Sequence, residues 1–173
     1  DEVYDVLNEG EVDRAARLVE VLDGRVANCP ELGLLDESLL RMKRLIRDTE
    51  TCRSLAADIG RHLTAEPPSW WCDARLPSDL TRDRLIHQLQ MWDMTGEHRL
   101  FVRGAVELVT RWNVNPDFFS FLIAQCVVHL EKSEVDPRLL ERFLAWREAL
   151  PNPERFRRSR GETTEVPEQE NVS

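Results

Sequence analysis

The stretch FFSFLIAQCVVHL, residues 118–130, is apolar on nearly every side of the helix that it is expected to form. Asn115 and Pro116 come shortly before it, and an N-cap residue followed by proline at the first helical position is typical of a helix start. A helix of this length that is apolar all round usually lies at the buried centre of a domain. The sequence therefore predicts a central helix over residues 116–131, with the other helices packed around it.

The rest of the chain also has a helical pattern. Apolar residues recur at three- and four-residue steps in five further segments, and a short helix is predicted at the N-terminus. These segments are 1–9, 11–27, 36–64 (with a break near Thr49–Thr51 left open), 78–94 (capped by Ser78), 97–112 and 137–150. Glycine is scarce, with 7 residues, and the helix formers Leu, Ala, Glu and Arg dominate. We predict an all-α fold of six to seven helices around the central one.

A change of composition divides the chain near residue 150. The first 150 residues are long enough to bury a sizeable core, and we predict one helical domain over residues 1–150. Pro151 and Pro153 end the last helix, and GETTEVPEQENVS, residues 161–173, is polar and acidic. Such a segment buries too little apolar surface to offset the entropy of ordering it. We therefore predict a disordered, charged tail over residues 151–173.

The net charge, the lengths of the apolar runs and the cysteine spacing indicate which classes of protein this chain can belong to. The formal net charge of −9 disfavours binding to nucleic acid and to anionic lipid, because both attract basic proteins. No run of residues approaches 18 consecutive apolar side chains, so no transmembrane helix is predicted. Cys29, Cys52, Cys72 and Cys126 show no CxxC spacing, and we expect reduced thiols. We expect a soluble intracellular protein, cytoplasmic or nuclear.

A proline-rich loop over residues 65–78 carries two adjacent tryptophans. Trp70 and Trp71 follow Pro67 and Pro68, and tryptophan is enriched where proteins bind one another. These four residues are the predicted partner-binding site. The other interpretation is that the loop folds back and the rings form a lid over the core, because tryptophan is usually largely buried.

Two polar features have simpler alternatives. Gln125, His129 and Lys132 share one stripe of the central helix, which is either a functional stripe or its solvent-facing strip. We favour the interpretation that these residues form the solvent-facing strip of the helix, since a single histidine rarely marks a site without partners. In the tail, Arg157, Arg158 and Arg160 form a candidate docking or nuclear-import element. The alternative is a solubilising tail whose charges bind nothing.

No spacing of residues along the sequence matches a catalytic or metal-binding motif. The sequence holds no nucleophile elbow and no metal-ligand spacing, so no catalytic residue, metal site or cofactor is predicted. The function predicted by exclusion is a protein–protein interaction module without catalytic activity, an adaptor or assembly subunit of an intracellular complex. The sequence does not identify the partner, which is another protein, and leaves a homo-oligomer open.

Two other functions stay open. An enzyme would need a site assembled from distant helices, with an acid, a base or a thiol converging on one pocket. A nucleic-acid-associated helical subunit would need the arginines of the 36–64 helix to gather on one face. The residues concerned are Arg41, Arg44, Arg47 and Arg53.

Overall fold

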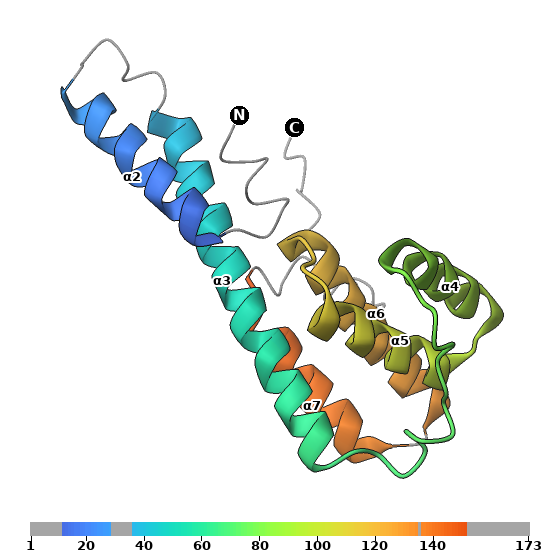
Figure 1. The fold of residues 1–173 in the computed structure, drawn as a ribbon. Coiled ribbons are helices and arrows are strands. Elements are labelled where there is room, and N and C mark those ends of the chain that lie inside the picture. Colours follow the sequence, from blue (N-terminus) through green and yellow to red (C-terminus); the bar gives the residue numbers. More distant parts are fainter. Residues whose placement is uncertain (1–11, 29–35, 135, 152–173) are drawn as a thin grey trace, which may run out of the picture.

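A computed structural model describes residues 12–28, 36–134 and 136–151 of the 173-residue chain, and it confirms the all-α fold. Over these residues the chain forms six α-helices and no strand (Figure 1). They are α2 (Val12–Asn28), α3 (Asp36–Ala65), α4 (Arg82–Thr95), α5 (His98–Arg111), α6 (Pro116–Ser133) and α7 (Pro137–Glu148). The helix predicted over residues 1–9 and the tail over 152–173 lie outside the described residues.

Two of the helix starts are those that the sequence predicts. The Asn115 side chain accepts a hydrogen bond from the backbone N–H of Phe118 at 2.8 Å, and Pro116 opens α6. The Asp136 carboxylate accepts from the N–H of Leu139 at 3.1 Å at the start of α7. Each cap satisfies a backbone donor that has no partner within its helix, which fixes where the helix begins.

The start of α4 differs from the prediction. Thr81, not Ser78, is the N-cap residue, and its hydroxyl oxygen accepts from the N–H of Arg84 at 3.3 Å. Residues 78–81 stay in the loop because Leu80 packs against the core, which leaves the helix to start after it. Ser78 and Thr81 each have a hydroxyl group that could cap the helix. The packing of Leu80 against the core places the helix start after Thr81.

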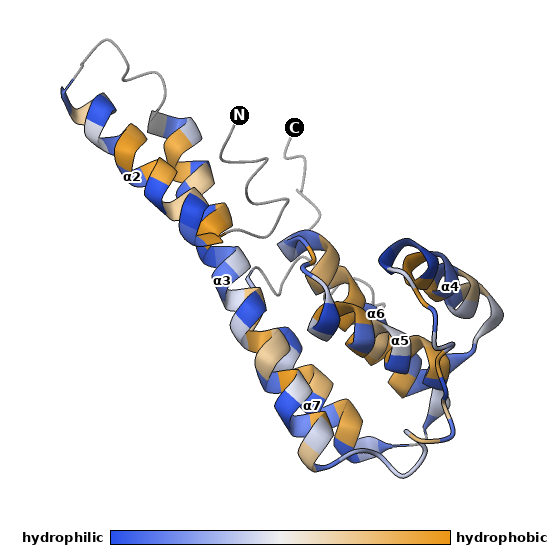
Figure 2. Ribbon diagram, in the orientation of Figure 1, coloured by the Kyte–Doolittle hydropathy of each residue, from blue (hydrophilic) through white to orange (hydrophobic). Residues whose placement is uncertain are grey.

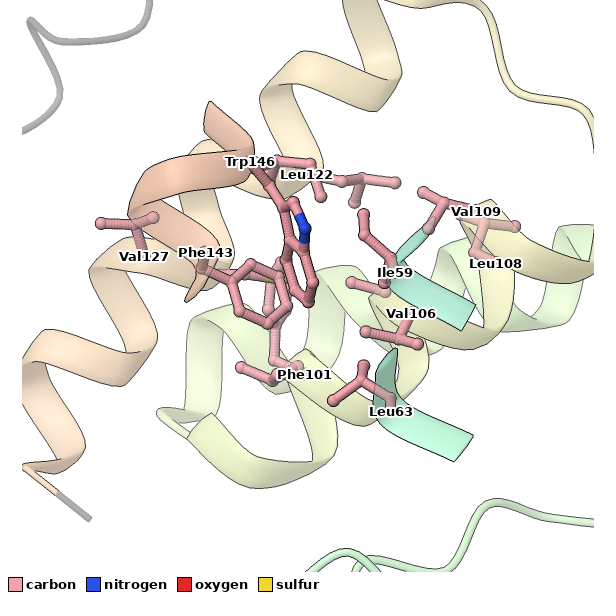
Figure 3. Close-up of a cluster of buried hydrophobic side chains, with 14 of the residues drawn as sticks. Ile59, Leu63, Phe101, Val106, Leu108, Val109, Leu122, Val127, Phe143 and Trp146 are labelled. Carbon is pink, nitrogen blue, oxygen red and sulfur yellow. The ribbon is translucent and has the colours of Figure 1, made fainter. Parts of the chain in front are cut away.

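Helix α6 lies at the centre of the main core, as predicted. Helices α3, α5 and α7 all pack against it. Figure 3 shows the side chains that meet there. They include Leu122 and Val127 from α6, Ile59 and Leu63 from α3, Phe101, Val106, Leu108 and Val109 from α5, and Phe143 and Trp146 from α7. The long helix α3 also packs against α5.

Helix α3 runs for 30 residues without the break that was left open near Thr49–Thr51. Thr49 Oγ1 donates to the carbonyl of Leu45 at 2.7 Å, and Thr51 Oγ1 donates to that of Arg47 at 3.0 Å. These bonds satisfy both hydroxyls inside the helix, so the threonines do not interrupt it.

The first half of α3 projects from the bundle together with α2. We call α2 and residues 36–50 of α3 the arm (Figure 1). Helix α2 packs against α3 and makes no comparable contact with another described helix. The arm has a small core of its own, separate from the main core, and Figure 2 shows hydrophobic residues on both of its helices. The buried residues of this core are Val12, Ala15, Val19 and Ile46.

Helices α4 and α5 approach each other closely at Gly104. A Cβ atom added there would lie 2.8 Å from Cζ3 of Trp92 and 3.1 Å from Cδ2 of Leu89. Gly60, near the C-terminal end of α3, is different, because its added Cβ would meet only Thr110 Cγ2 at 3.4 Å. Gly104 is therefore needed for the close packing of α4 against α5. Gly60 has room for a methyl group and does not need to be glycine.

We expect Gly104→Ala to lower the free energy of unfolding by about 1–3 kcal/mol, because the new methyl group overpacks the α4–α5 contact. Gly60→Ala is the matched control and should raise it by about 0.5–1 kcal/mol through helix propensity alone. Urea unfolding followed by far-UV circular dichroism measures both. Equal stabilisation by the two variants would show that α4 and α5 do not meet at Gly104.

Candidate functional site

The structure buries both tryptophans of the proline-rich loop. Trp70 is 5% exposed and Trp71 is 8% exposed, and both belong to the main core. Pro67 is exposed and Pro68 is half-buried. The loop is tightly turned rather than extended, since the N–H of Trp71 bonds to Pro68 and that of Ala74 bonds to Trp70. This turn lets two adjacent rings point into one core.

Two arginines of α5 lie over the faces of the two tryptophan rings. The Arg103 guanidinium lies 4.4 Å from the centre of the Trp71 ring, and that of Arg99 lies 5.9 Å from the centre of the Trp70 ring. Contacts of this kind attract a cation to the ring face. The geometry matches the lid interpretation of the loop. Partner binding through Trp70, Trp71, Pro67 and Pro68 stays a prediction, and it would require the rings to leave the core.

We expect Trp71→Ala to lower the free energy of unfolding by about 3–5 kcal/mol, the usual cost of truncating a buried tryptophan. Pro67→Ala in the same loop should change it by less than about 0.5 kcal/mol, because the side chain is exposed. Urea unfolding measures both. A Trp71→Ala variant as stable as the wild type would mean that the ring is not part of the core.

His129 is buried, so the prediction that it lies on a solvent-facing strip of α6 is wrong. It is 3% exposed, whereas Gln125 is half-buried and Lys132 is exposed. Its Nε2 lies 2.7 Å from Oδ1 of Asp93 at the end of α4, and its Nδ1 lies 2.7 Å from Nδ1 of His98 at the start of α5. The strip prediction failed because the turn between α4 and α5 folds over this side of α6.

Two hydrogen bonds orient the ring of His129. With neutral His129, Nε2–H donates to the Asp93 carboxylate and Nδ1 accepts from Nδ1–H of His98. Burial lowers the pKa of His129, and the hydrogen bond and charge of Asp93 oppose that shift. The Phe101 ring stacks on the imidazole at 4.2 Å between centroids. These contacts tie α4, α5 and α6 together through one neutral ring.

The direction of this shift gives a pH dependence. Because the folded chain holds His129 with a lowered pKa, the unfolded chain takes up more protons once the pH falls below about 6.5. The free energy of unfolding should therefore fall with decreasing pH there, by at most about 1.4 kcal/mol per pH unit from this group. His129→Gln should reduce that slope, and His87→Gln, at an exposed position, should not. Urea titrations between pH 5 and 8 test this, and an unchanged slope in His129→Gln would contradict it.

One concave site, which we call the groove, is lined mostly by apolar residues and has a volume of about 390 Å³. It runs from the base of the arm across the corner between α5 and α6 to the start of α4. Its apolar lining residues are Val12, Leu45, Cys52, Ala56, Ile86, Val109, Trp112, Val114, Pro116, Phe118 and Phe119. Thr49, Arg53, Arg82, Asn113 and Asn115 supply its polar atoms.

Three ionisable side chains are among the described lining residues of the groove. Only Cys52, Arg53 and Arg82 are ionisable among its described lining residues, which include no histidine or carboxylate. Burial, followed by the nearby charges of Asp48 and Asp117, raises the pKa of the Cys52 thiol to about 12. The thiol is therefore protonated at neutral pH and is a poor nucleophile. Neither guanidinium forms an ion pair with a described residue, so both remain available to a ligand.

The sequence did not single out this groove. Trp112 and Ile86 fall in the predicted helices 97–112 and 78–94, where apolar residues at helical spacing are expected to face the core. Val114 carried the one available signal, since an apolar residue in the short turn between two helices has few intrahelical neighbours to cover it. The groove itself needs α3, α4 and the α5–α6 corner to meet, which no short stretch of sequence specifies.

The arginines of α3 do not form one basic face. Six residues turn an α-helix by about 240°, so Arg41, Arg47 and Arg53 lie on three different sides. Arg41 also pairs with Glu37 at 3.1 Å. The tail arginines Arg157, Arg158 and Arg160 lie outside the described residues.

Across residues 12–28, 36–134 and 136–151, no helix combines the length and the apolar character needed to cross a bilayer. Within the same part of the chain, no three His, Cys, Asp or Glu side chains gather closely enough to hold a metal ion. Comparisons with protein-family models, curated proteins and solved structures found no match to this chain.

Proposed function

We propose that this chain is a protein–protein interaction module without catalytic activity, serving as an adaptor or assembly subunit of an intracellular complex. The observation that carries the proposal is the groove. It is lined mainly by apolar and aromatic side chains, and its described lining contains no general base and no activated nucleophile. A site of this composition supports binding rather than bond-breaking chemistry.

The shape and charges of the groove favour one kind of ligand. Grooves between helices commonly accept an amphipathic helix, whose apolar residues at i, i+3 or i+4, and i+7 insert between the walls. Trp112 and Phe118 offer aromatic surface for such residues, and aromatic side chains contribute strongly to binding energy. Arg53 on α3 and Arg82 on α4 would pair with carboxylates on the polar side of the bound helix.

Affinity capture of the intact chain from cell extract tests the proposal with two matched variants. Val114→Asp places a carboxylate in the groove, and Met94→Asp places one at an 80% exposed position outside it. We expect Val114→Asp to reduce recovery of a stoichiometric partner by about tenfold or more, because the carboxylate would be desolvated in the complex. Met94→Asp should recover the partner as the wild type does. Circular dichroism confirms that both variants are folded.

Each other outcome has a definite meaning. A partner that stays bound to Val114→Asp would show that the groove is not its binding site. If the wild type captures no protein under conditions that preserve complexes, the proposed function fails. Equal loss of the partner from both variants would indicate that added negative charge, rather than the groove, governs the interaction.

A further inference from the structure

The first described residue of the chain lies in the groove. Val12 begins α2, lines the groove at the base of the arm and is 1% exposed. Only Gly10 and Glu11 separate it from Glu9 along the chain. Three peptide steps of about 3.8 Å each keep the Cα atoms of Glu9 and Val12 within about 11 Å of each other. Residues 1–9 are therefore tethered at one end of the groove.

The sequence of residues 1–9, DEVYDVLNE, divides into an apolar side and an acidic side on a helix. At about 100° per residue, Val3, Tyr4, Val6 and Leu7 fall within an arc of about 160°. The opposite arc holds the other five residues, of which four are acidic, and the segment contains no basic residue. The helix predicted over residues 1–9 is thus amphipathic, with its carboxylates on the polar side.

The groove is complementary to such a helix in both polarity and charge. Trp112 and Phe118 are among its apolar walls, and Arg53 and Arg82 are its charged residues. Both arginines are exposed, so they can pair with carboxylates at the rim without being buried first. The described lining contains no carboxylate that would compete for them. A tethered segment with four acidic residues and one apolar side matches this surface.

The other long segments outside the described residues match the groove less well. Residues 29–35 follow Asn28, which lies about 24 Å from Val12 at the far end of α2. Residues 152–160 carry four arginines and one glutamate, so the arginines of the groove would repel them. Residues 161–173 are acidic, but valine is their only large apolar residue type, and it occurs twice. Charge and apolar content together favour residues 1–9.

We propose that residues 1–9 bind as an amphipathic helix in the groove of their own chain and compete there with the partner. The four apolar side chains of the segment cover the apolar walls, and its carboxylates pair with Arg53 and Arg82. The competition rests on the function proposed for the groove, whereas the docking itself does not.

The tether makes this competition reversible. A nine-residue helix is too short to be stable alone, so the groove would have to supply the stabilising contacts. A short linker gives the segment an effective concentration in the millimolar range, and a weak contact is enough to keep it docked. A docked segment that is tenfold more populated than the free one raises the apparent dissociation constant of a partner by about tenfold. A partner of micromolar affinity can still displace it.

Hydrogen exchange of the intact chain, read by mass spectrometry on peptides covering residues 1–9 and 112–119, tests the docking. Leu7→Asp places a carboxylate on the apolar side of the segment, and Asn8→Asp adds the same charge on its acidic side. In the wild type, the amides of residues 1–9 should exchange more slowly than those of an unstructured peptide. We expect Leu7→Asp to speed their exchange by about tenfold or more, and that of residues 113–115 with it. Asn8→Asp should change both by less than about twofold.

Variants of the groove test the same contact from the other side. Val114→Asp should release residues 1–9 as Leu7→Asp does, and Met94→Asp, at an 80% exposed position outside the groove, should not. Arg82→Gln should speed exchange of the segment by about threefold through the loss of one ion pair. Arg84→Gln is its control, because Arg84 is exposed on the same helix and does not line the groove. Circular dichroism checks that each variant is folded.

Three results of the exchange experiment would overturn the docking. Residues 1–9 that exchange in the wild type as fast as an unstructured peptide do not bind the groove. Protection that survives Leu7→Asp and Val114→Asp would mean that the segment binds elsewhere. Protection that appears only as the chain concentration rises would show that a second copy supplies the segment.

Affinity capture separates the competition from the function proposed for the groove. If the segment competes with the partner, recovery of that partner from cell extract should be several-fold higher with Leu7→Asp than with Asn8→Asp. Equal recovery by the two variants, with docking seen by exchange, would overturn the competition. If neither variant captures a partner, the function proposed for the groove fails, and the exchange data still decide whether residues 1–9 bind there.

Discussion

The burial of α6 is the constraint on which the rest of the structure depends. Its side chains are apolar around most of the circumference, so most of its surface must be kept from water, although Phe121 stays 44% exposed. No single neighbour can do this, and α3, α5 and α7 each cover part of the surface. The positions of these three helices follow from that requirement. The loop with Trp70 and Trp71 extends the same apolar core beyond the helices.

The length of α3 creates the groove. Only its second half is needed to cover α5 and α6, and its first half extends past the bundle with α2 alone beside it. The groove forms where α3 leaves the bundle, at the corner between α5 and α6. A helix longer than its core thus adds a concave surface at the edge of the bundle.

His129, Asp93 and His98 form a hydrogen-bonded cluster that joins α4, α5 and α6. His129 is held by Asp93 and His98, and its stacking on Phe101 makes it part of the core. None of the three polar residues lines the groove. Their hydrogen bonds fix the turn between α4 and α5 over α6, which is a structural role with a pH-dependent contribution to stability. Buried polar groups that are fully hydrogen-bonded commonly specify one arrangement of a core in this way.

Local patterns predicted the helices and their order, and several of their ends. Asn115 and Asp136 cap their helices through hydrogen bonds that span three residues, and the apolar character of 118–130 is visible in any short window. The choice of Thr81 over Ser78 already needed the packing of Leu80. The burial of Trp70 and Trp71, the contacts of His129 and the groove all came from the folded chain. His129 meets residues 31 and 36 positions away, and no periodicity records which distant helices will lie side by side. Hydrogen bonds within a helix are short-range and can be read along the chain, whereas these contacts exist only after the apolar faces have packed.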